Sequence, residues 1–568
     1  MKRILTAATV LLGFCLAGVS ARGQVTPERL LESAKEPQNW LMYSGDYAGR
    51  RYSTLDQINT KNAASLVPKW AYQTMAGGKF ETTSLVVDGV LYATGADDRA
   101  FALDARSGRP IWQYQRSLPP DIRPCCGRVN RGMAILGDKV FLGTLDAHVI
   151  ALDTKTGNVV WDVGTSDYSK GYSITLAPLV IKHLVLIGVS GGEYGIRGFV
   201  AAFDLDTGKE QWRTYTVPAP GEPGSNTWPQ GDQWKTGGAP VWVTGNYDPD
   251  TNIAYWGTGN GGPTIGDQRP GDNLYTTSTL ALDVTTGAIK GYFQYHQNDS
   301  WDYDEVSPPI LVDYQRNGRT YKGLIDVARD GYLWFLERSA GPIKFVEGKP
   351  YVYQNVFRSL DPETGRPDVD PAHKPGTGKR ADYCPGTHGG KNWPPIAFSP
   401  KTRMIYIPAN NNFCSSNMGG QVQYTPGRPF VGVQGSQPFA LPGADHFGEV
   451  QAWNVDTGQK VWTHSYPKSP NWGSMLATGG GLVFSGGTID RKFHAFDATT
   501  GKLLWEFPTN SGILAPPASF AMDGKQYIAV VSGWGGDSRG DQNTLNRLFP
   551  GEFPEVPEGG AIWVFAIE

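Results

Sequence analysis

The stretch ALDARSGRPIW, residues 102–112, is the first full copy of a motif that recurs along the chain. The motif reads Ala-x-Asp-x-x-[Thr/Ser]-Gly-x-x-x-Trp, and its second copy is ALDTKTGNVVW at 151–161. Close copies cover 202–212, 452–462 (with Asn for Asp) and 495–505, and a degenerate copy without the tryptophan covers 281–291. Self-similarity of this kind indicates one structural unit repeated along the chain.

Each copy predicts a strand, a tight turn and a second strand. A β-rich run such as residues 140–144 precedes the copy, the Asp-x-x-Thr-Gly segment has the residues of a hairpin turn, and the tryptophan ends the next strand. Consecutive copies lie 43 to 51 residues apart, from Trp462 to Trp505 and from Trp161 to Trp212. This period is typical of β-propeller blades. We expect each tryptophan to dock onto the neighbouring blade.

Counting the units predicts an all-β fold, an eight-bladed β-propeller. The six copies are joined by an early strand at 67–70 and a divergent unit at 361–365, and the terminal strand at 561–566 is expected to complete the first blade. Residues 24–568 form a single domain in this prediction. The segments 219–240, 262–276 and 366–395 are rich in Gly, Pro and Asn, which predicts long loops of the kind that carry function.

The composition indicates a globular protein without an electrostatic footprint for nucleic acid. The chain has 568 residues, of which 72 are Gly and 41 are Pro, and this argues against a long helical bundle. Hydrophobic residues make up 40% and charged residues 18%, the opposite of the signature of disorder. The net charge is -3 without a long run of one sign, so no nucleic-acid partner is expected.

The N-terminus has the layout of an export signal. Lys2 and Arg3 precede an apolar stretch at 4–19 and small residues at 19–21, which predicts a signal peptide over residues 1–23. A membrane anchor or a lipoprotein is the less favoured alternative, because the stretch is short for a span and Phe14 is a poor lipobox residue before Cys15. No later segment is apolar enough to span a bilayer. We expect an exported protein, periplasmic in a bacterium.

Four cysteines remain after the signal peptide: Cys125, Cys126, Cys384 and Cys414. An even number in an exported chain suggests disulfides. The residues alone leave several arrangements open, namely a bond between the adjacent pair, buried free thiols, or separate bridges from the adjacent pair to the two later cysteines. No Cys-x-x-Cys-His motif is present, so no covalently attached c-type haem is expected on this chain.

Four further motifs, together with the repeat, carry a resemblance to a known family. They are CCGRVNR at 125–131, SGGE at 190–193, WGTGN at 256–260 and SWDYD at 300–304. In this order and spacing they resemble the pyrroloquinoline quinone (PQQ) dependent alcohol dehydrogenases of the methanol and ethanol dehydrogenase family, over residues 25–568. The resemblance implies a propeller that binds PQQ and one metal ion.

Oxygen-donor side chains in these motifs are the candidates for the metal site. Hard cations such as Ca²⁺ prefer oxygen ligands, and the resemblance implies that Glu193 and Asn260 ligate the metal together with PQQ, with Asp302 as the general base. Asp304 would project to the same side as Asp302 if the segment were a strand. An acidic residue there resembles the lanthanide-using branch, although sugar-oxidising relatives also carry two acids. We therefore expect Glu193, Asn260, Asp302 and Asp304 around one lanthanide ion or Ca²⁺.

PQQ is a flat tricarboxylate, so its site needs an aromatic face and several cationic or amide donors. The resemblance places Trp242 beneath the ring and a disulfide of Cys125 with Cys126 above it. It assigns the carboxylates of PQQ to Arg131, Thr175, Ser190, Gly191 and Gly192. It places Arg329 and Asn392 at the quinone oxygens, with Trp393 and Trp472 nearby.

The cysteines are then expected to pair as Cys125 with Cys126 and Cys384 with Cys414. Two adjacent thiols cannot both reach distant partners without splaying the chain. Cys384 and Cys414, in contrast, lie 30 residues apart on the flanks of one expected hairpin.

The leading functional hypothesis is a periplasmic quinoprotein that oxidises a primary alcohol to an aldehyde and passes electrons to a separate soluble cytochrome c. Within the enzyme class, the alternative is a sugar or polyol dehydrogenase on the same scaffold. The alternative from another class is a non-catalytic propeller scaffold protein, which would need neither the adjacent cysteines nor the oxygen-donor set. The oligomeric state is open, with a homodimer as one option.

Overall fold

The computed structural model describes residues 24–568, and the predicted signal peptide at 1–23 lies outside the described residues. The described chain is mostly β-structure, with the α-helices α1 (Pro27–Leu31) and α2 (Asp537–Leu548) and several short 3-10 helices. None of the helices in this part of the chain is long and apolar enough to cross a membrane. The all-β prediction is confirmed.

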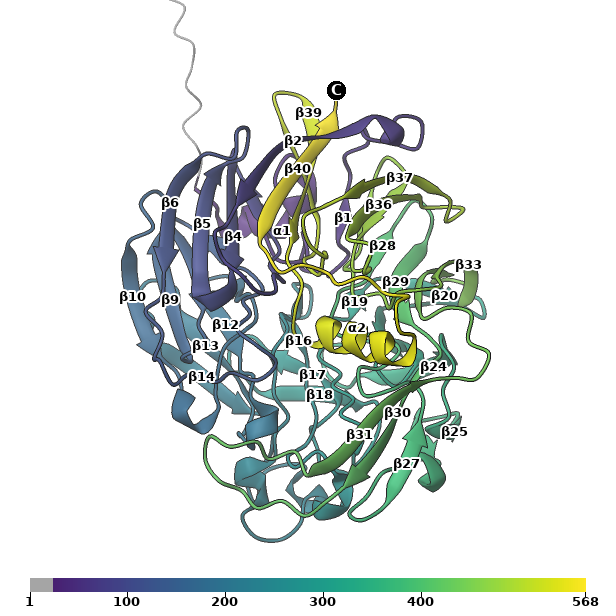
Figure 1. Cartoon of the computed structure of the whole chain (residues 1–568). Helices are drawn as coiled ribbons and strands as arrows, with labels where there is room; N and C mark the ends of the chain where they lie inside the picture. Colours follow the sequence, from purple (N-terminus) through teal and green to yellow (C-terminus); the bar gives the residue numbers. More distant parts are fainter. Residues whose placement is uncertain (1–23) are drawn as a thin grey trace, which may run out of the picture.

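Eight sheets of four or five strands form the bulk of the described chain, and in Figure 1 they follow one another around the molecule in chain order. In hydrogen-bonded order, the first four are β2 (Leu66–Gln73), β40 (Ala561–Ile567), β39 (Lys525–Ser532) and β38 (Ala518–Met522); β3 (Leu85–Val87), β4 (Val90–Gly95), β5 (Arg99–Asp104) and β6 (Pro110–Gln115); β7 (Ala134–Leu136), β8 (Lys139–Gly143), β9 (His148–Asp153) and β10 (Val159–Gly164); β11 (Leu179–Ile181), β12 (Leu184–Gly188), β13 (Phe199–Asp204) and β14 (Glu210–Tyr215).

The other four sheets are β15 (Asn246–Asp248), β16 (Ile253–Gly257), β17 (Ser278–Asp283) and β18 (Ile289–Gln294); β19 (Ile310–Leu311), β22 (Gly323–Val327), β23 (Tyr332–Glu337) and β24 (Lys344–Pro350); β28 (Ala397–Ser399), β29 (Met404–Asn410), β32 (Gly448–Asn454) and β33 (Gln459–Tyr466); β1 (Tyr52–Ser53), β34 (Leu476–Thr478), β35 (Leu482–Ser485), β36 (Lys492–Asp497) and β37 (Leu503–Pro508). Within these eight sheets, the β1–β34 pair is parallel and the other pairs are antiparallel.

An early strand, β2, and the last strand of the described chain, β40, meet in one sheet. β2 pairs with β40 along its whole length, with Leu66 opposite Ile567 and Gln73 opposite Ala561. β39 and β38 extend the same sheet on the other side of β40. The expectation that the terminal strand joins the first unit is confirmed.

The Asp-x-x-Thr-Gly segment of each copy forms the turn into the outermost strand of its sheet. Between β9 and β10, Asp153 Oδ1 accepts hydrogen bonds from the backbone N–H and the hydroxyl of Thr156, both at 2.8 Å. Gly157 adopts a φ of +71°, a left-handed conformation that glycine reaches without steric cost. A side-chain oxygen at the first position, the hydroxyl and the missing side chain therefore each serve the turn, and Asn454 provides the oxygen in the copy at 452–462.

The repeat tryptophans join consecutive sheets, which confirms their predicted docking. Trp112 of β6 donates its indole N–H to the backbone oxygen of Thr154 at 2.9 Å, in the turn of the next sheet. Equivalent bonds join Trp70 to Ala105, Trp161 to Leu205, Trp212 to Val284, Trp462 to Ala498 and Trp505 to Leu66. The indoles also pack on the turn glycines, since a Cβ on Gly157 would lie 2.7 Å from the ring of Trp112.

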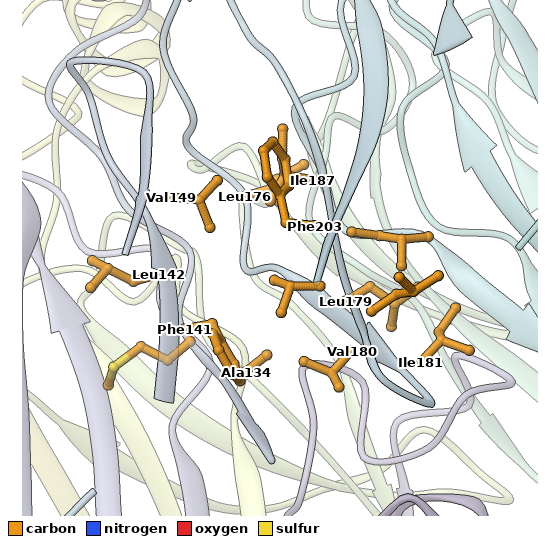
Figure 2. Packing of buried hydrophobic residues seen from close by; sticks show 14 of the residues in the cluster. Ala134, Phe141, Leu142, Val149, Leu176, Leu179, Val180, Ile181, Ile187 and Phe203 are labelled. Carbon is orange, nitrogen blue, oxygen red and sulfur yellow. The ribbon is translucent and has the colours of Figure 1, made fainter. Parts of the chain in front are cut away.

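Hydrophobic side chains fill the space between neighbouring sheets. Figure 2 shows one such interface, where Phe141 and Val149 of β8 and β9 lie in one cluster with Leu179 and Phe203 of β11 and β13. These side chains are buried. Because the sheets bury apolar side chains of this kind against one another, hydrophobic burial is the main favourable contribution to folding.

The unit at 361–365 and the loop at 366–395 differ from expectation. Residues 361–365 form the turn of a separate hairpin, β25 (Phe357–Leu360) with β26 (Pro367–Val369), and do not belong to a four-stranded sheet. A Cβ on Gly365 would lie 2.4 Å from Phe345 of β24, so a phenylalanine replaces the usual tryptophan. The expected loop contains β26 and β27 (Arg380–Tyr383). In the other small sheets, β30 (Phe413–Gly419) pairs with β27 on one side and β31 (Val433–Ala440) on the other, and β20 (Tyr314–Arg316) pairs with β21 (Arg319–Tyr321).

Candidate functional site

One cavity brings most of the predicted site residues together. Its lining consists of Lys79, Cys125, Cys126, Val129, Arg131, Thr175, Ser190, Gly191, Glu193, Trp242, Asp302, Asp304, Arg329, His388, Asn392, Trp393 and Asp537. Of the predicted residues, Gly192, Asn260 and Trp472 are not in the lining, but each lies next to or contacts a residue that is.

Asp302 and Asp304 reach the cavity from an irregular segment, so the strand geometry considered for this pair does not apply. Asp302 has a φ of +71°, a conformation that aspartate adopts more readily than most residues. The carboxylate of Asp299 fixes this turn, since it accepts hydrogen bonds from the backbone N–H groups of Trp301 at 3.2 Å and Asp302 at 3.1 Å. A capped turn, and not strand alternation, therefore brings the two carboxylates to one side.

Asn260 lies between these two carboxylates. Its Nδ2 donates to Asp302 Oδ1, and its backbone N–H donates to Asp304 Oδ1, both at 2.5 Å. Its Oδ1 is buried and has no hydrogen-bond partner among the described residues. A Cβ on Gly192 would lie 2.9 Å from this oxygen, so the SGGE segment approaches Asn260 closely only with glycine at this position.

Arg329 and Trp242 hold Asp304 from the other side. Trp242 Nε1 donates to Asp304 Oδ2 at 2.9 Å, and Arg329 Nη2 lies 3.4 Å from the same oxygen. Arg329 also donates to the backbone oxygen of Asp302 at 2.8 Å and to Asn392 Oδ1 at 3.2 Å. One guanidinium therefore links both acidic residues to the amide of Asn392.

The acidic groups of the site lie close together in a buried place. Burial and the neighbouring Asp304 carboxylate raise the pKa of Glu193 to about 7. Burial, followed by the charges of Asp304 and Glu193, raises the pKa of Asp302 well above its ordinary value. The carboxyl groups of Glu193, Asp302 and Asp304, of which the last is buried, and one unpartnered amide oxygen form the donor set that hard cations prefer. These residues fit the metal ion that the resemblance implies.

A second wall of the cavity is built from polar and cationic side chains. Arg131 Nη1 donates to Thr175 Oγ1 at 2.9 Å, and Ser190 Oγ lies 3.4 Å from the Thr175 hydroxyl. The guanidinium carbon of Arg131 lies 4.7 Å from the ring centre of Trp242 and 4.9 Å from that of Trp393. The predicted donors for anionic groups and the predicted aromatic face are thus neighbours.

Both predicted disulfides are present. Cys125 is bonded to Cys126, and Cys384 is bonded to Cys414. The sulfur atoms of the adjacent pair and a carboxylate oxygen of Glu193 lie within 4.8 Å of one another. The disulfide therefore faces the same part of the cavity as Glu193.

Three charged residues of the lining were not predicted: Lys79, His388 and Asp537. His388 Nδ1 lies 2.7 Å from Asp541 Oδ1 of α2. Burial lowers the pKa of the imidazole, but the Asp541 carboxylate outweighs this effect and raises the pKa of His388 to about 9. Although burial opposes its charge, the nearby Lys79 and His388 lower the pKa of Asp537. Each of the three residues is adjacent to a Gly-Gly pair in the sequence. Such a pair lets the backbone approach a ligand closely, and this signal could have identified the three residues.

Trp472 and Glu81 support this part of the lining from behind. Trp472 donates Nε1–H to Asp541 Oδ2 at 3.0 Å, and its ring contacts that of His388. Glu81 is 1% exposed and pairs with both Lys79 at 3.0 Å and Arg131 at 2.6 Å. Acidic residues behind the wall therefore orient the cations that face the cavity.

The lining as a whole also fits a flat polyanionic cofactor. It offers the cationic side chains of Lys79, Arg131, Arg329 and protonated His388, together with the indole of Trp242 and an apolar disulfide. A planar tricarboxylate requires this combination of an aromatic face and separate cations.

The fold and this site define a quinoprotein dehydrogenase of the β-propeller class. The family model "PQQ: Glucose/ethanol/alcohol dehydrogenase, beta-propeller domain" matches residues 40–357 and 466–528. The chain therefore belongs to the family of PQQ-dependent alcohol dehydrogenases, as its sequence motifs had indicated.

Individual relatives cover nearly the whole chain. Quinoprotein alcohol dehydrogenase PedH of Pseudomonas putida is 38% identical, over 100% of this chain and 97% of that protein. The lanthanide-dependent methanol dehydrogenase of Methylacidiphilum fumariolicum is 36% identical, over 99% of this chain and 97% of that protein. A solved europium-containing methanol dehydrogenase superimposes with a TM-score of 0.89 at 35% identity, over 95% of this chain and 100% of that chain.

Proposed function

We propose that this protein oxidises primary alcohols to aldehydes with PQQ and one bound metal ion. The observation that carries the proposal is the convergence of Asp302, Asp304 and Arg329 with Trp242 in one cavity, held together by direct hydrogen bonds. Similarity to quinoprotein alcohol dehydrogenases over the full chain supports it.

Asp302 is the proposed general base. Asn260 Nδ2 binds its Oδ1, while its Oδ2 has no hydrogen bond within the described residues and is free to accept the proton of the substrate hydroxyl. PQQ, when bound, supplies the electron-accepting quinone that takes the hydride from the alcohol carbon. Arg329 holds Asp302 through its backbone oxygen, so the base keeps its orientation as its charge changes.

The proposed metal ligands from this chain are Glu193, Asn260, Asp302 and Asp304. Three carboxylates around one site favour a trivalent ion over a divalent one, because each added carboxylate gains more from the higher charge. We propose a lanthanide as the metal of the most active form. The similarity to a lanthanide-dependent methanol dehydrogenase supports this choice.

Three further assignments belong to the same proposal. The protein acts in the periplasm after cleavage of the signal peptide, and a separate soluble cytochrome c takes the electrons, since the chain has no Cys-x-x-Cys-His motif. The eight large sheets are proposed to be the blades of one closed ring. The tryptophan bonds that lead from sheet to sheet, including Trp505 to Leu66 and Trp70 to Ala105, support this count.

Reconstitution is the experiment that tests the proposal. Metal-free protein is loaded with PQQ and either Ca²⁺ or a light lanthanide, and is assayed with primary alcohols, sugars and polyols using an artificial dye acceptor. We expect a bound-quinone absorption band and turnover of primary alcohols. Turnover of sugars or polyols alone would replace the substrate class, and absence of any quinone binding would refute the enzyme.

A further inference from the structure

A second group of potential metal ligands lies away from the cavity. It consists of His296, Glu305 and Asp330, whose exposed fractions are 0%, 1% and 0%. One donor atom from each, the ring nitrogen or a carboxylate oxygen, lies within 4.8 Å of the other two. None of the three residues is part of the cavity lining. The cluster is therefore separate from the predicted ligand set of Glu193, Asn260, Asp302 and Asp304.

Each residue of the cluster uses one polar atom elsewhere and leaves one without a partner. His296 Nε2 lies 3.1 Å from Asp299 Oδ1, Glu305 Oε2 accepts from the backbone N–H of Arg329 at 3.1 Å, and Asp330 Oδ1 accepts from Tyr332 at 2.8 Å. The remaining atoms, His296 Nδ1, Glu305 Oε1 and Asp330 Oδ2, are buried and form no hydrogen bond within the described residues.

When His296 is neutral and the two carboxyl groups are ionised, all three of these free atoms are hydrogen-bond acceptors. Because a carboxylate can only accept, Asp299 places the imidazole hydrogen on Nε2 and leaves a lone pair on Nδ1. That lone pair faces Asp330 Oδ2 at 3.9 Å. No lysine or arginine among the described residues forms an ion pair with Glu305 or Asp330. A buried carboxylate without a partner is costly, and the cost is removed either by a proton or by a bound cation. The convergence of one imidazole and two carboxyl oxygens within 4.8 Å of one another is the geometry that suits a cation.

We propose that His296, Glu305 and Asp330 bind one divalent cation. The ligating atoms are Nδ1, Oε1 and Oδ2, and the two carboxylates balance the double charge. One imidazole with two carboxylates is a donor set of intermediate softness, which suits Zn²⁺ better than Ca²⁺ or a lanthanide. Because the site is closed to solvent, the ion has a structural role.

The ion would join the two segments that carry the proposed catalytic groups. His296 holds Asp299, which caps the turn of Asp302, and Glu305 holds the backbone of Arg329. Asp330 follows Arg329 directly in the sequence. The cation would thus fix the spacing of Asp302 and Arg329 from behind.

Crystallography at the zinc absorption edge tests the proposal on the unaltered holoenzyme. Protein purified with Zn²⁺ and then dialysed against metal-free buffer should show an anomalous peak about 2.0–2.2 Å from His296 Nδ1, Glu305 Oε1 and Asp330 Oδ2. Elemental mass spectrometry should find one zinc per chain in addition to the metal of the cavity. A water or no density at this point, without zinc in the protein, would overturn the proposal.

Matched variants separate this site from the proposed active site. Asp330→Asn should lower the zinc content at least about tenfold, because it removes charge while keeping the hydrogen-bonding shape. Asp326→Asn is the control, since Asp326 is equally buried but bonds to Tyr295 at 2.5 Å outside the cluster, and it should retain zinc. Glu193→Gln should lose the cavity metal and keep zinc.

Glu305→Gln serves as a second variant if Asp330→Asn does not fold. Equal zinc content in the wild type and in the folded variant would refute the site. Failure of PQQ binding with zinc retained would instead contradict the proposed function alone.

Discussion

Trp242 and Asp304 are joined by a hydrogen bond of 2.9 Å from the indole nitrogen to Oδ2. This bond connects the predicted aromatic face of the cofactor site to the predicted metal site. Asp304 is therefore both a candidate metal ligand and the anchor of the indole. Substitutions at this position must distinguish the loss of charge from the loss of the acceptor.

Asp304→Asn removes the charge but retains an oxygen acceptor for Trp242. If Asp304 ligates a trivalent ion, Asp304→Asn and Asp304→Ala should both weaken lanthanide activation by roughly tenfold or more relative to Ca²⁺ activation. The measurement is turnover against metal concentration for each ion. If only the alanine variant is impaired, and equally with both ions, the carboxylate serves as an anchor and not as the extra ligand.

Asp302→Asn should lower turnover by about 10²–10⁴-fold, the usual contribution of a general base. The amide keeps the volume and can still accept from Asn260, so PQQ loading should persist. Loading is measured by absorption and turnover by dye reduction on the same sample. Wild-type turnover in a fully loaded variant would rule out the assigned role.

His388 and Asp541 should make stability depend on pH. The pKa of His388 in the fold, about 9, lies above its ordinary value of 6.5, because Asp541 outweighs the effect of burial. The protonated pair therefore stabilises the fold fully below about pH 6.5, and this contribution is lost as the pH rises through 9. Asp537 and Arg329 also act on this imidazole, with opposite signs.

His388→Gln tests this dependence by denaturant unfolding at pH 6 and pH 9.5. The free energy of unfolding of the variant should fall below that of the wild type by a larger amount at pH 6 than at pH 9.5. Asp541→Asn is the matched control, since it removes the partner while keeping an acceptor for Trp472, and it should show the same trend. A difference from wild type that does not change with pH would contradict the charged pair.

The sequence predicted those features that depend on residues close together in the chain. The turns with Asp, Thr and Gly are local, so the docking of the five repeat tryptophans could be predicted from the sequence. The sheet of β19, β22, β23 and β24 escaped detection because Phe345 replaces the tryptophan and the turn at Gly365 comes from a separate hairpin.

Side chains that meet only through the tertiary fold could not be predicted in the same way. Lys79, His388 and Asp537 come from segments more than 140 residues apart. The only sequence feature that they share is an adjacent Gly-Gly pair, which does not show that the three segments meet. The cluster of His296, Glu305 and Asp330 has no recognisable spacing either. The four family motifs, in contrast, placed nearly all of the predicted residues at one cavity because the resemblance carries the tertiary arrangement with it.

The docking of tryptophan on the turn glycine can be tested with two glycines of similar backbone conformation. Gly157 has a φ of +71° and Gly137 a φ of +64°, but a Cβ on Gly157 would lie 2.7 Å from Trp112, whereas a Cβ on Gly137 would have no atom within 4 Å. Gly137→Ala should cost only the left-handed backbone, about 1–2 kcal/mol. Gly157→Ala should cost a further ~1–3 kcal/mol, because the indole must move.

The two variants are compared by their free energies of unfolding from denaturant titration. Unfolding is followed by circular dichroism, because the fluorescence of Trp112 cannot be separated from that of the other tryptophans. Equal losses for both variants would show that the turn conformation alone, and not the packing of the indole, makes glycine necessary in the repeat.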